Sequence, residues 1–399
     1  MAGPLAGIKV LEMTSVVLGP WACQILGDMG AEVIKVEAPR GDSNRALGPY
    51  RNHPDMAALF LTCNRNKRCI VLDLKQDSGR AAALKLAAEA DVMVHNFRPQ
   101  AMQRLQLDYE AIKAVNSKII YCATYGYGKA GPYGAKGALD DSIQAASGAA
   151  YLQAAAFGEP RYLPTVVADK TTALTVVYAV LAALFHRERS GQGQEIEVPM
   201  FETMVHFLMA EHLWGLSFEP PIGKAGYTRL MSLQRRPYKT KDGYIAVLPY
   251  MNDHWVTFCE AAGAPQLATD ERFDSMGARL KNIDATYAET GKLLATRTTA
   301  EWLEIFDATN VPTMVVNSPD DLVNDPHLQA IDFFKIADHP TEGQIRMTDF
   351  PVNFSETQAE VRQMAPRLGE HSAEILKELG LSQASIDAML ASGATQLPS

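Results

Sequence analysis

Asp169 is the residue whose type and position most favour a chemical role. It follows an apolar stretch at residues 165–168 and precedes a long apolar helix expected over residues 171–189. A carboxylate at the start of a helix faces unpaired backbone N–H groups, which favour the anion and lower its pKa. Position alone indicates a helix N-cap. An aspartate carboxylate can also act as a covalent nucleophile. The start of a helix is compatible with both the capping role and the nucleophilic role.

Four basic residues follow the expected ends of strands and could hold phosphate groups. They are Arg40, Lys75, Arg98 and Arg104. A guanidinium group binds phosphate through two parallel hydrogen bonds, which suits arginine to a phosphorylated ligand. A single arginine is more often a solvated surface charge, but the clustering at strand ends favours a ligand site.

A glycine-rich segment at residues 126–131 fits the pattern G-x-G-x-x-G after an expected strand. In a dinucleotide site this pattern opens a helix, and an acidic residue follows about 20 positions later. Here Pro132 and Gly134 follow at once, and the acidic residue is missing. We therefore expect a loop over the functional site, with Tyr125 or Tyr127 lining it, and no dinucleotide-binding turn.

The elements that must position these residues alternate between strand and helix. A parallel α/β sheet of Rossmann-like type is expected from this alternation, with ligands at the carboxyl ends of the strands. The helix at 171–189 carries apolar residues on most of its faces, Leu174 included, and is expected to be buried. The expected strands are residues 8–11, 32–37, 69–74, 91–95, 118–123 and 194–198, and the expected helices are 21–29, 79–90, 171–189 and 201–213.

The second half of the chain indicates a separate domain, because 399 residues exceed the usual size of one core. Residues 215–226 are rich in Gly and Pro, and we place a boundary there. Beyond it, Asp242-Gly243 supplies the turn of a hairpin expected over residues 237–248. Further helices are expected at residues 252–262, 299–309 and 372–379, and a strand at 312–316.

Composition excludes several classes of protein. The formal net charge of −9 disfavours DNA or RNA binding through a broad basic surface. The five cysteines are scattered and contain no C-x-x-C pair, which suits reduced thiols. His206 and His212 lie six positions apart, so they do not share a helix face, and no metal site is expected. No signal peptide and no run of about 18 apolar residues is found, so we expect a cytoplasmic protein without a membrane partner.

A set of motifs along nearly the whole chain resembles the class III CoA-transferases of the CaiB/BaiF type, the family of formyl-CoA transferase and crotonobetainyl-CoA:carnitine CoA-transferase. Each motif is weak alone, but their order and spacing together are specific. The motifs include Leu5-Ala-Gly-Ile-Lys-Val-Leu-Glu12, Leu26-Gly-Asp-Met-Gly-Ala-Glu-Val-Ile-Lys-Val-Glu37, Asn64-Arg-Asn-Lys-Arg68, Asn96-Phe-Arg-Pro99, Gly126-Tyr-Gly128, Ala168-Asp169, Gly191-Gln-Gly-Gln194, Asn324-Asp-Pro-His327 and Leu368-Gly-Glu-His371.

The resemblance implies an enzyme that exchanges CoA between two carboxylic acids through an aspartyl-CoA thioester, with Asp169 as nucleophile. CoA would be a substrate, and no tightly bound cofactor is expected. It implies a large CoA-binding domain of residues 1–214 and 326–399, a smaller α+β domain of residues 215–325, and an interlocked homodimer. The implied CoA contacts are Val17, Leu18, Arg40, Leu72, Lys75, Asn96, Phe97, Arg98, Arg104 and Asp140.

Departures from the family pattern bear on the substrate. Ala38 stands where formyl-CoA transferase has a basic residue, so that contact is absent or shifted to Arg40. The run of consecutive glycines found in that enzyme is also absent, which argues against formyl-CoA and oxalate as substrates. Three arginines at the start of the smaller domain, Arg229, Arg235 and Arg236, could bind a second carboxylate, which points to a dicarboxylic pair with succinyl-CoA as donor.

Two other functions stay open at this point. An α-methylacyl-CoA racemase of the same family would pair the aspartate with a histidine from a Gly-His-Asp segment. The corresponding place here reads Gly137-Ala-Leu-Asp140 and holds no histidine, which disfavours proton transfer. A CoA-binding protein without catalysis is the second alternative, and Asp169 in its expected setting argues against it.

Overall fold

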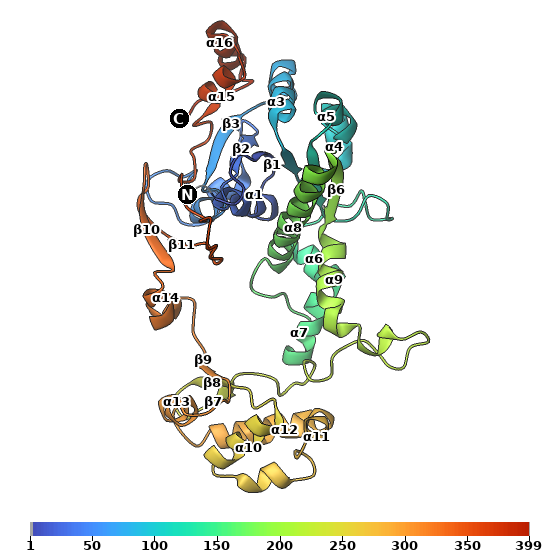
Figure 1. Ribbon diagram of the computed structural model, residues 1–399, viewed down its shortest axis with the longest axis vertical. Coiled ribbons are helices and arrows are strands. Elements are labelled where there is room, and N and C mark those ends of the chain that lie inside the picture. The colour runs from blue at the N-terminus through green and yellow to red at the C-terminus, as the bar shows by residue number, and fades with distance from the viewer. Residues whose placement is uncertain (1–2, 399) are drawn as a thin grey trace. The chain divides into compact units, whose positions relative to one another are not determined.

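A six-stranded parallel sheet forms the centre of the first half of the chain in the computed structural model, which describes residues 3–398 (Figure 1). The strand order is β3-β2-β1-β4-β5-β6, and every neighbouring pair is parallel. This order reverses between β1 and β4, where open α/β sheets bind ligands at their carboxyl edge. The strands are β1 Lys9–Met13, β2 Glu32–Glu37, β3 Lys67–Val71, β4 Val92–His95, β5 Ile120–Tyr125 and β6 Gln194–Pro199.

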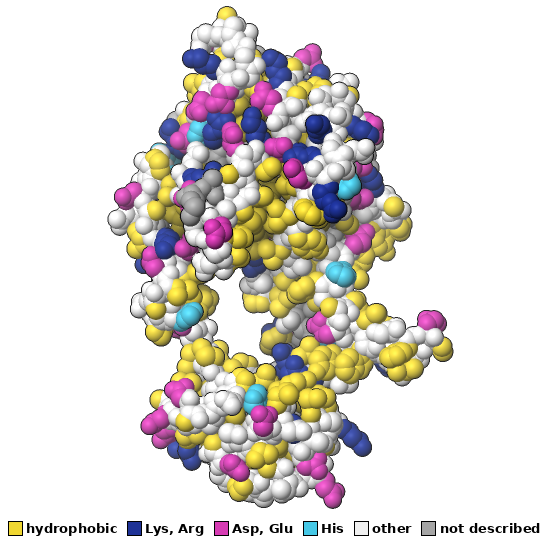
Figure 2. Space-filling model, in the orientation of Figure 1, with side chains coloured by type: hydrophobic (Ala, Val, Ile, Leu, Met, Phe, Trp, Pro, Cys, Tyr) yellow, Lys and Arg dark blue, Asp and Glu magenta, His cyan; other side chains and the backbone are white. Residues whose placement is uncertain are grey.

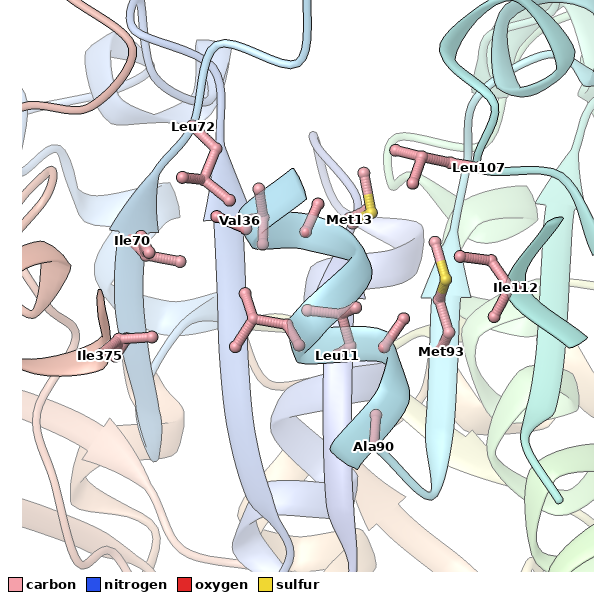
Figure 3. Packing of buried hydrophobic residues seen from close by; sticks show 14 of the residues in the cluster. Leu11, Met13, Val36, Ile70, Leu72, Ala90, Met93, Leu107, Ile112 and Ile375 are labelled. Atoms are coloured by element: carbon pink, nitrogen blue, oxygen red, sulfur yellow. The ribbon is translucent and has the colours of Figure 1, made fainter. Parts of the chain in front are cut away.

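One face of the sheet packs against helices through a buried apolar cluster. Side chains of alternate residues point to the same face of a strand, so Leu11 and Met13 of β1 lie beside Met93 of β4. Figure 3 shows these residues together with Ile70 and Ile375 in the layer between strands and helices. The helices of this layer are α3 Asp77–Glu89, α4 Pro99–Leu105, α5 Tyr109–Val115, α15 Ser372–Glu378 and α16 Gln383–Ser392.

The opposite face is covered by α1 Leu18–Asp28 and α8 Val167–Ser190, which pack on each other. By length and composition, α8 is the one helix among residues 3–398 that could cross a membrane, yet half of its most apolar window is buried against its neighbours. Its other half is not buried, because Leu174, Tyr178 and Phe185 are each more than half exposed. The expectation of a helix buried on most faces was therefore wrong for the single chain. Figure 2 shows hydrophobic atoms gathered on the surface where Figure 1 draws α8.

The C-terminal segment returns to the sheet. Ser372 at the start of α15 accepts a hydrogen bond from the backbone N–H of Val71 at the end of β3, at 3.1 Å. Thr395 donates its hydroxyl to the Val71 carbonyl at 2.7 Å, so the chain end is tied to the same strand. The remaining elements of this part are 3-10 helix η1 Ser43–Ala46, helices α2 Ala58–Cys63 and α6 Asp140–Ser147, and the antiparallel pair β10 Phe334–His339 and β11 Gly343–Thr348.

The residues divide into two compact units. The first contains the chain up to Ser147, Pro164–Phe207 and the residues from Asp332 onward, and the second contains Gly148–Leu163 and Leu208–Ile331. The sequence predicts one domain of residues 1–214 and 326–399 and a second of residues 215–325. That these two parts are separate domains stays a prediction.

The second unit has its own core around a three-stranded sheet of order β7-β8-β9. Trp302 stacks on Phe306, and Phe306 stacks on Phe258, with centroids 5.4 and 5.8 Å apart. Thr298 and Glu301 form a capping box at the start of α13. The strands are β7 Tyr238–Lys239, β8 Tyr244–Val247 and β9 Thr313–Val315, and the helices are α7 Ala149–Phe157, α10 Asn252–Ala261, α11 Met276–Lys281, α12 Ile283–Leu294, α13 Thr299–Asp307 and α14 Pro326–Ala330, with 3-10 helices η2 Trp214–Ser217, η3 Pro265–Thr269 and η4 Asp321–Asn324. Helix α9, Met200–His212, follows β6 directly.

Candidate active site

Asp169 lies in the first turn of α8 and is not its N-cap. The helix begins at Val167, two residues before Asp169, and its N-cap residue Val166 makes no side-chain cap hydrogen bond. The capping hydrogen bond comes from Asp140, whose Oδ1 accepts the backbone N–H of Asp169 at 2.9 Å. The expectation that Asp169 caps the helix was therefore wrong. Its side chain is left available for another role.

The pKa of Asp169 is raised to about 7, not lowered as the helix-start argument predicts. The first cause is burial, which takes the charged form out of water, and the second is the negative charge of Asp140. Asp169 is only 8% exposed. Desolvation and a like charge thus outweigh the favourable field of the helix N-terminus.

Asp140, the first residue of α6, is itself held in place by hydrogen bonds. Its Oδ2 accepts from the side-chain amide of Gln144 at 2.6 Å, one helical turn further on. Gln144 also donates to the backbone carbonyl of Thr165 at 3.2 Å, which links α6 to the segment that enters α8. The Asp140 carboxylate therefore has a fixed position behind the Asp169 backbone.

Asp169 opens into a cavity of about 150 Å³ at the carboxyl edge of the sheet. The segments after β1 and β4, and the end of β5 with the residues that follow it, form its wall, as expected for the reversal point of a Rossmann-like order. They contribute Ser15, Val16, Leu18, Asn96, Arg98, Pro99 and Thr124–Tyr127, and Gly134, Lys136–Leu139, Met200 and Asp169 complete the lining.

Two cations, Arg98 and Lys136, face the same cavity as Asp169. The backbone at Gly137 lies close to Arg98, because a Cβ added at Gly137 would be 2.6 Å from a guanidinium nitrogen. Glycine at position 137 thus leaves room for the arginine. The Lys136 ammonium lies 3.9 Å from the ring centroid of Tyr133, a cation–π contact. A cavity lined by two cations suits a substrate that carries negative charge.

The structure brings some of the predicted site residues together and not others. Leu18, Asn96 and Arg98 line the cavity with Asp169, and Asp140 contacts Asp169 from behind. Val17 is buried beside Leu18 at the start of α1. The other predicted CoA contacts do not line this cavity. Arg40, Lys75 and Phe97 lie in the chain after β2, β3 and β4, whereas the Leu72 side chain is fully buried in the apolar cluster and Arg104 lies in the last turn of α4. Their role in binding CoA stays a prediction.

The loop between β1 and α1 has an unusual backbone at the cavity wall. Val16 has φ of +72°, in the left-handed region that a β-branched residue rarely adopts. Its N–H donates to Asp42 Oδ1 at 3.1 Å, and its carbonyl accepts from the Asn44 side chain. Ser15 and Asn96 exchange two hydrogen bonds, at 3.2 and 2.9 Å, which tie this loop to the end of β4. The surrounding contacts therefore hold the loop in a conformation that Val16 would not choose alone.

A buried ionic network lies under the same loop. The Lys35 ammonium contacts Glu12 at 2.9 Å and Asp42 at 3.1 Å, and also donates to the Thr14 carbonyl at 2.9 Å. Lys67 contacts Glu12 from the other side at 2.8 Å. Burial acts to lower the pKa of Lys35, but Glu12 and Asp42 outweigh it and raise that pKa. Both lysines are fully buried, so each charge depends on its partners.

The glycine-rich segment at residues 126–131 forms a loop, as predicted, and no helix opens before Asp140. Two carboxylates hold the loop: Glu202 accepts the N–H of Gly128 at 3.0 Å, and Glu197 accepts the N–H of Lys129 at 2.6 Å. Tyr125 and Tyr127 both line the cavity.

Several residues that line the cavity were not among those expected from the sequence, among them Thr124, Lys136 and Met200. Lys136 carried one weak hint, since it is a cation close to Asp140 in the chain. No group of three or more His, Cys, Asp or Glu side chains placed to hold a metal ion is found within residues 3–398.

Comparison with known proteins gives matches over almost the whole chain. A family model described as CoA-transferase family III matches residues 5–372. The succinate–glutarate CoA-transferase of Agrobacterium fabrum is 34% identical over 391 residues, which cover 94% of this chain and 96% of that protein. The succinyl-CoA:glutarate CoA-transferase of Mus musculus is 31% identical over 392 residues, covering 98% and 90%. The crystal structure of a CaiB/BaiF family protein from Brucella suis matches with a TM-score of 0.80 at 31% identity, covering 95% and 100%.

Proposed function

Because the chain belongs to CoA-transferase family III and is an acyl-CoA:carboxylate CoA-transferase, we propose that Asp169 is its covalent nucleophile. The observation that carries this proposal is the position of Asp169. It is a nearly buried carboxylate at the sheet's reversal point, in a cavity with two cations. A pKa of about 7 leaves a substantial fraction of the side chain ionised at neutral pH.

The reaction begins with attack of an Asp169 carboxylate oxygen on the thioester carbonyl of the donor. The carbon–sulfur bond breaks, CoA leaves as thiolate, and a mixed anhydride joins Asp169 to the acyl group. The thiolate then attacks the aspartyl carbonyl and releases the donor acid as a carboxylate. Asp169 now carries CoA as a thioester.

The acceptor acid repeats these steps in reverse. Its carboxylate attacks the aspartyl thioester, which releases the thiolate and forms a new mixed anhydride between the acceptor and Asp169. The thiolate then attacks the acyl carbon of this anhydride that belongs to the acceptor. The acyl–oxygen bond of that anhydride breaks, the new acyl-CoA leaves, and the Asp169 carboxylate is restored. One thioester replaces another throughout, so the exchange needs no external energy source.

We propose that CoA binds along the carboxyl edge of the sheet. Arg98 and Asn96 lie in the cavity with Asp169, and the chain after β2 and β3 supplies Arg40, Leu72 and Lys75 on the same edge. Phe97 and Arg104 extend this set beyond β4, and Val17 and Leu18 supply the start of α1. Guanidinium and ammonium groups along one edge suit the phosphates of CoA.

A racemase-type reaction is the competing function, and the cavity disfavours it. Proton exchange beside a thioester would need a second acid–base group, which the racemase branch takes from a histidine. Gly137, Ala138 and Leu139 of the corresponding segment line the cavity, and none of its described lining residues is a histidine.

The substrates that we propose are succinyl-CoA as donor and a dicarboxylic acid as acceptor. Support comes from two relatives named for succinate or succinyl-CoA and glutarate, both above 30% identity over nearly the whole chain.

We also propose an interlocked homodimer, because α8 leaves Leu174, Tyr178 and Phe185 exposed in the single chain. Five free cysteines favour a cytoplasmic location, and no tightly bound cofactor is proposed.

A trapping experiment tests the covalent step. The protein is mixed with succinyl-CoA, quenched, and digested, and the peptide that contains Asp169 is examined by mass spectrometry with and without hydroxylamine. The proposal expects a CoA adduct on Asp169 that hydroxylamine converts to a hydroxamate. Acyl-CoA binding without any adduct would support a CoA-binding protein, and exchange of the proton next to the thioester in deuterated water would support the racemase.

A further inference from the structure

A cavity of about 330 Å³ lies in the first compact unit, between α2 and the hairpin of β10 and β11 (Figure 1). Its volume is within the range of small-molecule sites, which begins at about 300 Å³. The residues that line it and those that line the Asp169 cavity form two separate sets, with no member in common. No step of the proposed transfer reaction uses this second cavity.

Most of the wall of this cavity is apolar and rich in methionine. Met56, Met347 and Met364 line it, together with Leu61 of α2 and Ile345 of β11. Met56 and Met347 are buried, so the cavity has a packed apolar floor. Methionine side chains are unbranched and adapt their shape, which suits contact with a flexible alkyl chain.

Two arginines tie the hairpin to the opposite wall of the cavity. The Nη1 of Arg51 donates to the backbone carbonyls of Glu342 and Gln344, both at 2.9 Å. At the far end of β11, Arg65 donates to the Thr348 carbonyl at 2.7 Å. The two walls are therefore held together by the protein itself, and the cavity is formed before any ligand binds.

Three cations also line the cavity, and they differ in how their charge is used. Arg65 is paired with Asp28 at 2.8 Å, and Arg51 uses one of its nitrogens to hold the hairpin. Arg346 of β11 is exposed, and its side chain forms no hydrogen bond or ion pair within residues 3–398. A lone surface cation is ordinary, but Arg346 borders a preformed apolar cavity and keeps all five of its N–H donors.

Among the described residues of the wall, the one acid is Glu342, and its carboxylate is already engaged. Its Oε2 accepts the backbone N–H of Asn52 at 2.8 Å, and its Oε1 lies 2.8 Å from the Nδ1 of His53. These contacts leave Glu342 buried and pointed at the protein, so the charge that the cavity presents to a ligand is mainly positive.

We propose that this cavity binds a free monocarboxylic acid with an unbranched alkyl chain of medium length. The carboxylate pairs with the planar guanidinium of Arg346, which offers two parallel N–H donors, and Arg51 adds a second positive charge. The alkyl chain leaves water and lies against the methionines of the wall. The inference does not depend on the role of Asp169, because it concerns a separate cavity.

Calorimetric titration of the whole chain with three probes tests the site. Octanoate carries both the charge and the chain, butanoate has a shorter chain, and octan-1-ol has the chain without the charge. Arg346→Met removes the cation, and Ala58→Leu fills the cavity from the start of α2, where leucine is a good helix former. Arg80→Met is the control, because Arg80 pairs with Asp77 on α3 and lies outside the cavity.

We expect one octanoate to bind per chain, with an affinity that rises by about fourfold for each methylene from butanoate onward. Arg346→Met should weaken octanoate by about tenfold, as loss of a charge-assisted hydrogen bond does, and leave octan-1-ol within about twofold of the wild type. Ala58→Leu should weaken both eight-carbon probes, because it removes the space for the chain. Arg80→Met should bind all three probes as the wild type does.

Three results would overturn the inference. The first is an absence of octanoate binding to the wild type. The second is equal octanoate affinity in the wild type and Arg346→Met, which would show that the arginine does not hold the carboxylate. The third is octanoate binding that survives in Ala58→Leu and is lost in Arg98→Met, because the acid would then occupy the Asp169 cavity.

Discussion

The Asp140 carboxylate accepts the backbone N–H of Asp169 at 2.9 Å and so places a second negative charge next to the proposed nucleophile. One carboxylate thus has two opposing effects on its neighbour. It completes the first turn of α8 and fixes the backbone of Asp169, while its charge makes ionisation of the Asp169 side chain less favourable. A less stable carboxylate anion gains more from attacking a carbonyl carbon, which favours the covalent step.

Replacement of the proposed nucleophile gives the most direct prediction. Asp169→Asn should lower kcat by at least roughly a thousandfold, because an amide does not form the anhydride. The side chain keeps its size, so the far-UV circular dichroism and the affinity for CoA should match those of the wild type. Activity is measured by exchange of labelled succinate into succinyl-CoA. Turnover near the wild-type rate would eliminate Asp169 as the nucleophile.

The pH dependence of activity reports the Asp169 ionisation. Its pKa of about 7 predicts that kcat/KM for the donor rises with pH and levels off above neutrality. Asp140→Asn keeps an oxygen to accept the Asp169 N–H but removes the negative charge. The rise should then move to lower pH, since one of the two causes of the raised pKa is gone. A profile that is the same in both proteins would show that another group controls the rise.

The same ionisation should affect stability, and its sign follows from the raised pKa. In the unfolded chain Asp169 titrates near its ordinary value of 3.8, and in the folded protein near 7. Its contribution to the free energy of unfolding is therefore fully present below about pH 4 and is lost as the pH rises to about 7. The loss is at most roughly 4 kcal/mol. Urea unfolding of wild type and Asp169→Asn from pH 4 to 8 should show the variant gaining relative stability, and a constant difference would contradict this.

Local patterns sufficed to predict the sheet, because each strand is a short apolar run between helices or turns. They did not predict which side chains meet. Asp140 and Asp169 are 29 positions apart, and only folding of α6 against α8 joins them. Lys35 alternates with apolar residues in β2, which is typical of a strand with one solvent-exposed face. Helices cover both faces of this sheet, so Lys35 is buried and needs Glu12 as partner.

The first residue of α8 was also missed, because Val166 and Val167 look like the end of a strand and give no cap signal. The true cap comes from a side chain distant in sequence. Such a cap has no local pattern. The wrong sign for the pKa of Asp169 has a different cause, because the burial of its side chain and the charge of Asp140 arise only from the tertiary fold.

Arg98 should act on substrate binding and little on the chemical step. It lines the cavity beside Asp169, so Arg98→Met should raise the KM for acyl-CoA by about 10- to 100-fold with kcat nearly unchanged. The KM of the wild type should rise with ionic strength more steeply than that of the variant. Arg80→Met serves as control, because Arg80 pairs with Asp77 on the surface of α3. A drop in kcat without a change in KM would instead place Arg98 in the chemical step.

The buried network below the cavity predicts a large effect on stability from a single lysine. Lys35→Met would leave Asp42 without its ammonium partner and the Thr14 carbonyl without its donor, while Glu12 keeps Lys67 and the Thr14 hydroxyl as partners. We expect the free energy of unfolding to fall by about 3–5 kcal/mol, as when one partner of a buried ion pair is removed.

The surface pair Lys9–Glu89 provides the control for this variant, because its atoms are 3.5 Å apart and both side chains are at least half exposed. Lys9→Met should cost about 1 kcal/mol or less. The lost contact to Thr14 also loosens the loop that carries Val16, so the KM of Lys35→Met for acyl-CoA should rise while that of Lys9→Met stays constant. Both variants are compared by urea unfolding and steady-state kinetics. Equal stability losses in the two variants would mean that the buried charges under the loop contribute no more than surface charges do.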